Sequence, residues 1–206
     1  MPTYKLYYFP SKGRAELIRW IFVQAGVPYE DKRIAGEEWA AFKPNTPFGS
    51  IPVLDVDGKL LAGSGPIARY LAEELGLAGS NAIENCELAS LYDVMDDLFA
   101  KLAGFFFEKD EARKATLKKD LDDTQLPKYL GILDKRIKDN GSSEGWIYGQ
   151  KLTYADLRVA LVSDVVVMIG GANVLDAYPD LAKLKATVEA LPNIAKWIQE
   201  RPKTEF

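Results

Sequence analysis

The sequence predicts an α/β domain over residues 1–79 followed by an all-helical domain over residues 82–206. Two features predict this division. In the first part, strand-like runs and helical repeats follow one another in the order βαβαββα, whereas every later periodic segment has helical spacing. A polar join that contains Gly76 and Gly79 separates the two parts. With 206 residues, 48% of them hydrophobic, the chain is long enough to build both cores.

The first domain is expected to open with a strand that turns directly into a helix. Strand formers fill the first run, and apolar residues then recur at helical spacing until Gly26 ends the helix. Asp57 and Gly58 predict a tight hairpin, and Ser64 has the position of an N-cap. The predicted elements are strands at 4–9, 29–34, 51–55 and 59–62 and helices at 15–24, 37–43 and 64–75.

The second domain is predicted to contain only helices. Thr153 and Asp156 have the spacing of a capping box directly before an apolar run. We therefore assign this pair to the folding of the helical domain rather than to substrate binding. The predicted helices cover residues 83–107, 111–139, 153–169, 181–190 and 193–201.

The charge balance and the residue types exclude several kinds of function. The 26 basic and 30 acidic residues give a net charge of −4, and no basic stripe suits a phosphate backbone, so nucleic acid is not an expected partner. No apolar run of about 18 residues and no signal core is present, so we expect a cytoplasmic protein without a membrane partner. Cys86, the single cysteine, excludes an intrachain disulfide and is expected to be a small core residue. The chain has no histidine, the commonest general base and metal ligand.

One corner of the first domain has the chemistry to bind an anion. The first strand ends at Tyr7 and Tyr8, the chain turns through Gly13, and a helix opens with Arg14. Free backbone N–H groups and the positive end of the helix dipole favour an anion at such a corner. A thiolate is one candidate anion, and a tyrosine hydroxyl can donate to it. Because Tyr7 and Tyr8 are adjacent, they should point to opposite faces of the strand.

Three separated segments together resemble one family. They are Tyr8–Phe9 with Gly13–Glu16, Glu38–Trp39 with Pro47–Leu54, and Ser64 with Ile67–Leu71. In this order and at these separations, they are similar to the sigma class of cytosolic glutathione transferases, over the whole chain. The resemblance implies a thioredoxin-like N-terminal domain, an all-helical C-terminal domain and a homodimer. It also implies glutathione as co-substrate, no required metal and a cis peptide bond between Ile51 and Pro52.

The resemblance assigns the thiol chemistry to the turn after the first strand. Tyr8 supplies the hydroxyl that stabilises the glutathione thiolate, and Arg14 helps to hold that hydroxyl. Ser11 is a rival donor, because other transferase classes use a serine in this turn. The full set of residues that the resemblance assigns to glutathione is Tyr8, Arg14, Trp39, Lys43, Gly49, Ser50, Ile51, Pro52, Gly63, Ser64 and Asp97.

Within this set, the ends of the tripeptide have separate partners. Trp39 and Lys43 lie four residues apart, so an indole N–H and an ammonium can meet one carboxylate, which in the family is that of the glycine. Ser64 belongs to the γ-glutamyl end, and Asp97 is expected to reach the glutathione ammonium of the partner subunit. Relatives usually carry Gln at position 63 and Gln or Lys at position 50. Gly63 and Ser50 are therefore expected to weaken glutathione binding.

The second substrate is expected to be a small hydrophobic electrophile in an apolar pocket. The residues assigned to this pocket are Phe9, Gly13, Phe99, Phe105, Phe106 and Phe206. We expect a glutathione transferase, with lipid peroxides among its substrates. A glutathione-dependent prostaglandin isomerase is the alternative enzyme, although Gly104 stands where that activity relies on an aromatic residue. Two further alternatives stay open: a non-enzymatic relative similar to the S-crystallins, and a divalent cation at the carboxylates Asp93, Asp96 and Asp97.

Overall fold

The computed structural model describes residues 2–204 and 206 and divides the chain into two compact units. One unit runs up to Ala78 and also contains the segment from Pro192 onward, and the other is Gly79–Leu191. The sequence-based division placed the C-terminal segment in the helical domain. The structure places it in the first unit instead, because the last helix packs against the first helix of the sheet domain.

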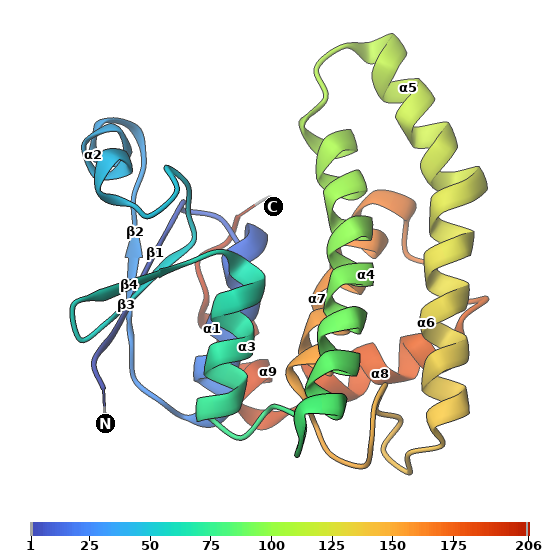
Figure 1. The fold of residues 1–206 in the computed structure, drawn as a ribbon. Helices are drawn as coiled ribbons and strands as arrows, with labels where there is room; N and C mark the ends of the chain where they lie inside the picture. The colour runs from blue at the N-terminus through green and yellow to red at the C-terminus, as the bar shows by residue number, and fades with distance from the viewer. Residues whose placement is uncertain (1, 205) are drawn as a thin grey trace. The chain divides into compact units, whose positions relative to one another are not determined.

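The first unit is built on a four-stranded mixed sheet (Figure 1). Its strands are β1 (Tyr4–Tyr8), β2 (Glu30–Arg33), β3 (Val53–Val56) and β4 (Lys59–Ala62), arranged in the order β2-β1-β3-β4. β2 runs parallel to β1, whereas β3 and β4 are antiparallel to their neighbours. The predicted hairpin between β3 and β4 is confirmed, with φ of 49° at Asp57 and 89° at Gly58.

Helices cover one face of this sheet. α1 (Glu16–Ala25) and α3 (Ser64–Glu74) pack together there, and α9 (Pro192–Glu200) packs against α1 (Figure 1). The short helix α2 (Gly36–Phe42) lies apart from them, followed by a 3₁₀ turn over Lys43–Asn45. Every second residue of β1 is buried, as a strand with one covered face requires.

The start of α3 differs from the prediction. Ser64 is the first residue of the helix rather than its cap, and Gly63 occupies the N-cap position with φ of 89° and ψ of 129°. Few residues other than glycine adopt this backbone conformation. The helix therefore begins one residue earlier than the capping chemistry of serine indicated.

The second unit is entirely helical among its described residues. Its helices are α4 (Ala82–Phe107), α5 (Glu111–Asp120), α6 (Leu126–Asn140), α7 (Tyr154–Gly170) and α8 (Pro179–Glu189). α7 is buried along most of its length and packs against α4 and α8. A π-helical turn, Leu121–Gln125, joins α5 to α6, where the sequence predicted one continuous helix.

The capping box of α7 is confirmed. The backbone N–H of Thr153 donates to Asp156 Oδ2 at 2.8 Å, and the N–H of Ile147 donates to Oδ1 at the same distance. Burial raises the pKa of Asp156 to about 6, against the opposing effect of these hydrogen bonds. The carboxylate thus fixes two separate backbone segments at the start of the most buried helix.

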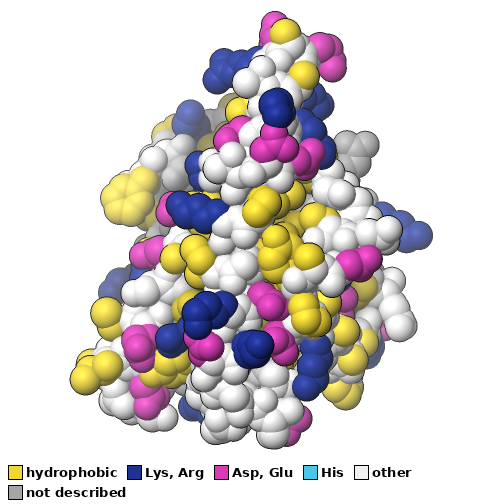
Figure 2. Space-filling model, turned by 90° about the vertical axis from the view of Figure 1, so that its right-hand side faces the viewer, with side chains coloured by type: hydrophobic (Ala, Val, Ile, Leu, Met, Phe, Trp, Pro, Cys, Tyr) yellow, Lys and Arg dark blue, Asp and Glu magenta, His cyan; other side chains and the backbone are white. Residues whose placement is uncertain are grey.

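The surface of the second unit corrects one expectation. Cys86 is exposed on α4 and is not a core residue. Figure 2 shows acidic and basic side chains interspersed on one face of the molecule, with hydrophobic side chains among them. Of the helices formed by residues 2–204 and 206, none has both the length and the apolar character needed to cross a bilayer.

Candidate active site

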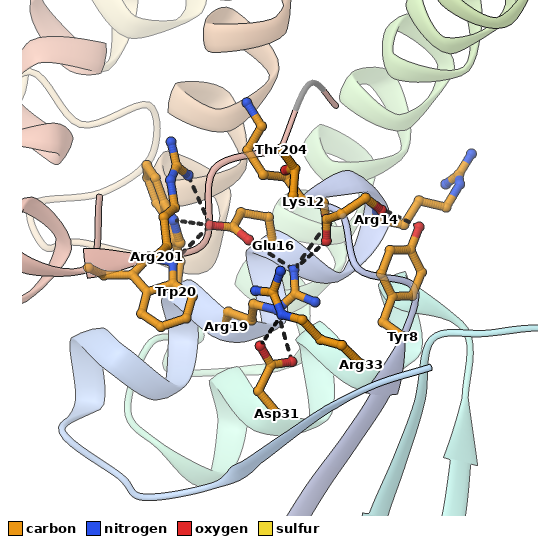
Figure 3. Close-up of polar contacts among 12 residues, drawn as sticks. Tyr8, Lys12, Arg14, Glu16, Arg19, Trp20, Asp31, Arg33, Arg201 and Thr204 are labelled. Carbon is orange, nitrogen blue, oxygen red and sulfur yellow. Dashed lines mark hydrogen bonds and ion pairs between the residues drawn. The ribbon is translucent and has the colours of Figure 1, made fainter. Parts of the chain in front are cut away.

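The site is built around the turn that joins β1 to α1. Tyr8 ends β1 with only 8% of its surface exposed. Its hydroxyl oxygen accepts a hydrogen bond of 3.0 Å from the backbone N–H of Arg14 (Figure 3). Arg14 lies in the 3₁₀ turn, Gly13–Ala15, that precedes α1. Because an oxygen that accepts a hydrogen bond becomes a stronger O–H donor, this contact prepares Tyr8 to donate to an anion.

Gly13 allows the turn to approach the phenol this closely. Its φ is +42°, and a Cβ atom added there would lie 2.7 Å from the Tyr8 oxygen and 3.0 Å from Cε1. Any larger residue would have to displace either the ring or the turn. The glycine is therefore part of what places the hydroxyl.

The two adjacent tyrosines face opposite sides of the sheet, as predicted. The Tyr7 ring stacks on Phe42 of α2 with 4.4 Å between centroids, away from the turn. The Tyr8 ring lies 5.7 Å from that of Phe9, which in turn meets Trp39 edge to face at 5.6 Å. Aromatic contacts thus join the end of β1 to α2.

The two residues assigned to the glycine carboxylate lie on α2 and at its C-terminal end. The backbone N–H of Lys43 bonds to the carbonyl of Trp39, so the two residues are one helical turn apart on the same side. Gly49 lies close by with φ of 65°, because a Cβ atom there would be 3.8 Å from Lys43 Cε. An indole N–H and an ammonium in this arrangement can both donate hydrogen bonds to one carboxylate.

The backbone between α2 and α3 contains the other assigned positions of the first unit. The peptide bond between Ile51 and Pro52 is cis, as the resemblance implied. Pro52 immediately precedes β3, and its carbonyl accepts from the N–H of Gly63 at 3.3 Å. Ser64 opens α3, where the N–H groups of the first turn and the helix dipole favour an anion.

The carboxylates predicted on α4 have separate surroundings. Asp96 pairs with the buried Arg158 of α7 at 2.9 Å, whereas Asp93 and Asp97 are exposed. Within residues 2–204 and 206, no three His, Cys, Asp or Glu side chains are grouped to hold a metal ion. Asp96 therefore has a structural partner within its own unit.

The aromatic residues assigned to the second substrate belong to both units. Phe9, Gly13 and Phe206 are in the first unit, and the backbone carbonyl of Phe206 accepts from the N–H of Lys12 at 2.8 Å. In the second unit, the ring of Phe99 is 4% exposed and lies 4.7 Å from the Arg158 guanidinium. Phe105 lies beside Lys114, and Phe106 meets Phe107 edge to face. Their grouping into one pocket stays a prediction.

Sequence reasoning missed an ion-pair cluster next to the turn that joins β1 to α1. Glu16 and Arg19 are both buried on α1, and Glu16 Oε2 lies 3.0 Å from Arg19 Nη1 (Figure 3). Burial alone would raise the pKa of Glu16, but Arg19, Trp197 and Arg201 outweigh it and lower that pKa. The pattern contained a signal: two opposite charges one turn apart on the apolar side of a helix are expected to pair when they are buried.

Comparison with known family models matches nearly the whole chain. Residues 2–73 match the model of the glutathione S-transferase N-terminal domain, and residues 96–201 match that of the glutathione S-transferase C-terminal domain. The first match lies within the sheet unit, and the second covers most of the helical unit and part of the C-terminal segment.

Individual proteins show the same similarity. Over 204 residues, the chain is 40% identical to hematopoietic prostaglandin D synthase of Gallus gallus, and this match covers 99% of each chain. It is 39% identical over 221 residues to glutathione S-transferase 1 of Ascaris suum, with 100% of each chain covered. The solved structure of monomeric Na-GST-3, a glutathione S-transferase of Necator americanus, is also similar, with a TM-score of 0.87 and 36% identity over 99% of this chain and 100% of that chain.

Proposed function

The chain belongs to the glutathione S-transferase family and is a glutathione transferase, and we propose that the Tyr8 hydroxyl stabilises the thiolate it transfers. The hydrogen bond from the Arg14 N–H to the Tyr8 oxygen is the observation that carries the proposal. This bond occupies an acceptor site on the phenol and leaves its proton to be donated to sulfur. The nucleophile is then the thiolate of reduced glutathione, which attacks a hydrophobic electrophile.

The energies involved are within reach of this corner. A thiol with a pKa of about 8.5 is only about 3% ionised at pH 7. Lowering its pKa by about two units requires roughly 2.7 kcal/mol of preferential interaction with the thiolate. A hydrogen bond to a charged group contributes about 1.5–3 kcal/mol, and a helix N-terminus adds about 0.3–1 kcal/mol. Tyr8 and the first turn before α1 therefore suffice without a general base or a metal.

Arg14 acts here mainly through its backbone. Figure 3 shows its side chain directed away from the Tyr8 ring, while its N–H makes the contact to the hydroxyl. The resemblance assigned Arg14 to holding this hydroxyl, and we retain that role. The helix that follows contributes the positive end of its dipole to the same corner.

We propose that glutathione is bound along the first unit. Trp39 and Lys43 meet the glycine carboxylate, the strand edge at Ile51 and Pro52 pairs with the cysteinyl part, and the start of α3 meets the γ-glutamyl carboxylate. Asp97 of a second copy reaches the glutathione ammonium. The complete proposed set remains Tyr8, Arg14, Trp39, Lys43, Gly49, Ser50, Ile51, Pro52, Gly63, Ser64 and Asp97.

The second substrate is proposed to be a small hydrophobic electrophile, lipid peroxides included. The aromatic residues Phe9, Phe99, Phe105, Phe106 and Phe206, with Gly13, are proposed to form its pocket. We further propose that the enzyme works in the cytoplasm, without a metal, as the resemblance implies. Turnover of an aryl halide with glutathione tests the enzyme directly, and its absence together with retention on immobilised glutathione would favour a non-enzymatic, S-crystallin-like role.

A second candidate function is favoured by the relatives named hematopoietic prostaglandin D synthase. The prostaglandin D synthase of Gallus gallus is 40% identical to this chain. A glutathione-dependent isomerase would need the same glutathione thiolate as the transferase. Incubation with prostaglandin H₂ and glutathione, followed by product analysis, separates the two. Prostaglandin D formation at a rate that exceeds aryl halide conjugation would make the isomerase the main activity.

The decisive variant for the proposed chemistry is Tyr8→Phe. Removal of one hydrogen bond to the thiolate should raise the pKa of the bound thiol by about one to two units and reduce kcat/KM about 10- to 100-fold at pH 6.5. The thiolate absorbance of bound glutathione, titrated against pH, measures this shift. Tyr7→Phe is the matched control, because Tyr7 faces α2. A comparable loss in Ser11→Ala, with none in Tyr8→Phe, would move the assignment to Ser11.

A further inference from the structure

The side chain of Arg19 links three parts of the first unit. It is fully buried on α1, and its Nε donates to Asp31 Oδ1 of β2 at 3.1 Å. Its Nη1 donates to Glu16 Oε2 at 3.0 Å and to the backbone carbonyl of Ser11 at 2.8 Å, with a longer contact of 3.3 Å to the carbonyl of Lys12 (Figure 3). One guanidinium thus holds the two residues that precede the catalytic 3₁₀ turn.

The same guanidinium faces the catalytic ring. Arg19 Cζ lies 5.9 Å from the centroid of the Tyr8 ring, within the range of a cation–π contact. The ring therefore has the Arg14 N–H at its hydroxyl and the Arg19 guanidinium over its face. Both contacts depend on the conformation of residues 11–14.

One nitrogen of Arg19 is left without compensation. Its Nη2 is buried and has no hydrogen-bond partner within the part of the chain that the structure describes. A buried unsatisfied donor costs about 1–3 kcal/mol. The position of Arg19 therefore leaves one of its donors unsatisfied. A buried polar group without a partner often marks a functional constraint.

Glu16 connects Arg19 to the last helix. Its Oε1 accepts from Trp197 Nε1 at 2.8 Å and from Arg201 Nη1 at 2.9 Å, and also from Trp20 Nε1 at 3.2 Å. Trp197 lies on α9, and Arg201 directly follows that helix. The contacts of Glu16 explain why the C-terminal segment belongs to the sheet unit. Through Glu16 and Arg19, this segment is connected to the catalytic turn.

We propose that Arg19, braced through Glu16 by Trp197 and Arg201, is a positioning residue for thiol ionisation. It holds the carbonyls of residues 11 and 12, so that the N–H of Arg14 stays on the Tyr8 hydroxyl. Loss of this anchor lets the turn relax and weakens the donor that the thiolate needs. The inference rests on the proposed role of Tyr8.

Arg19→Lys tests this role. Lysine keeps one positive charge beside Glu16 but cannot reproduce the bonds to Asp31 and to both carbonyls, because it lacks the planar fork of donors. The pKa of the bound thiol should rise by about one unit, and the pH profile of kcat/KM should move upward with it, which is about a tenfold loss at a pH below both values. The KM for glutathione should change little, because the residues assigned to its carboxylates lie elsewhere.

Arg33→Gln is the matched control. Arg33 belongs to the same cluster, since its Nε donates to Asp31 Oδ2 at 2.9 Å, but among the residues that the structure describes its ion-pair partner is Asp31 and not the turn. The bound thiol should titrate as in the wild type in this variant. An Arg19→Lys protein that melts at a lower temperature but titrates like the wild type would show a purely structural role and overturn the proposal.

Arg201→Gln reaches the same network from its outer end and decides the matter if Arg19→Lys does not fold. Its thiol pKa should shift in the same direction by a smaller amount, about two- to threefold in thiolate fraction. No shift in Arg201→Gln, with Arg19→Lys unfolded or unshifted, would also overturn the proposal. Wild type and Tyr8→Phe are titrated alongside: an unshifted thiol in the wild type rejects the proposed function, whereas a Tyr8-dependent shift that ignores Arg19 and Arg201 rejects only this inference.

Discussion

At the residue scale, the position of the Tyr8 hydroxyl depends on a glycine as much as on the tyrosine. Gly13→Ala would add a Cβ atom 2.7 Å from the Tyr8 hydroxyl, at a residue whose φ is already positive. The added methyl should push the ring away from the Arg14 N–H and lower kcat/KM about tenfold, as loss of one such hydrogen bond would. Steady-state kinetics and denaturant unfolding measure activity and stability on the same protein.

Gly26→Ala separates backbone strain from this steric effect. Gly26 caps α1 with φ of 66°, and no heavy atom of the described residues lies within 4 Å of the Cβ that alanine would add. It should lose about 1–2 kcal/mol of stability through the left-handed backbone alone. Its kcat/KM should stay that of the wild type. Equal losses of activity in Gly13→Ala and Gly26→Ala would contradict the steric role of Gly13.

At Gly63, a side chain that could bind glutathione would come at the cost of backbone strain. Gly63→Gln restores the amide that relatives usually carry, yet φ at this position is +89° and a Cβ atom would lie 3.3 Å from Pro66 Cδ. We expect the variant to lose about 1–3 kcal/mol of unfolding free energy while it binds glutathione more tightly. Gly63→Ala carries the strain without the amide and is the control in both chemical denaturation and calorimetry. No gain in affinity over Gly63→Ala would mean that the backbone already satisfies the ligand.

At the scale of the elements, two buried carboxylates should respond to pH in opposite directions. Burial raises the pKa of Asp156 to about 6 from an ordinary value of 3.8, so the folded state binds the extra proton between these values. The contribution of Asp156 to the unfolding free energy should therefore fall by about 2 kcal/mol as the pH rises from 4 to 6. The difference in unfolding free energy between wild type and Asp156→Asn, measured across this range, should decrease with pH. A constant or rising difference would contradict the prediction.

Glu16 on α1 has the opposite sign. Its pKa is lowered, because Arg19, Trp197 and Arg201 outweigh the effect of burial. Its stabilising contribution is present above its ordinary pKa of 4.5 and is lost as the pH falls through the lowered value. The difference in unfolding free energy between wild type and Glu16→Gln should therefore shrink on acidification, the reverse of Asp156→Asn. The same slope in both variants would be inconsistent with this assignment.

The sequence predicted elements best where local chemistry decided them. The Asp57–Gly58 hairpin, the capping box of Asp156 and the opposite orientations of Tyr7 and Tyr8 follow from short-range geometry, and the structure confirms them. The start of α3 was misplaced because the backbone of Gly63 overrides the capping preference of Ser64. The π-helical turn between α5 and α6 leaves no clear mark in apolar spacing, since it changes the period only locally.

At the scale of the whole molecule, the sequence placed the C-terminal segment in the wrong unit, because long-range polar contacts hold that segment against the sheet domain. Trp197 and Arg201 reach Glu16 from the far end of the chain, and nothing in their own spacing indicates that partner. Tyr8 was predicted as the catalytic residue from a family resemblance. The contacts that join Arg19 to the turn, and Glu16 to the C-terminal segment, are seen only in the structure. Residues that recognise substrate can match a motif, but the residues that support them are joined by the fold.

The homodimer that the resemblance implied is the last expectation to test. Phe48 is 81% exposed on the first unit, and the second unit has an apolar groove of about 350 Å³ between α4 and α6, lined by Leu91, Val94, Ile132 and Leu133 with polar residues beside them. An exposed aromatic side chain and an apolar groove are complementary surfaces for two copies of one chain. We expect Phe48 of each copy to occupy the groove of the other.

Sedimentation equilibrium should therefore show a wild-type dimer and a Phe48→Ser monomer. Ile132→Asp should also dissociate, because it places a charge in the groove that receives Phe48. Phe107→Ser is the control, since Phe107 is 63% exposed but lies outside the groove, and it should remain dimeric. If Asp97 reaches the ligand of the other copy, the Phe48→Ser monomer should also bind glutathione more weakly. A dimer that survives both Phe48→Ser and Ile132→Asp, or a wild-type monomer like that described for Na-GST-3, would refute this pairing.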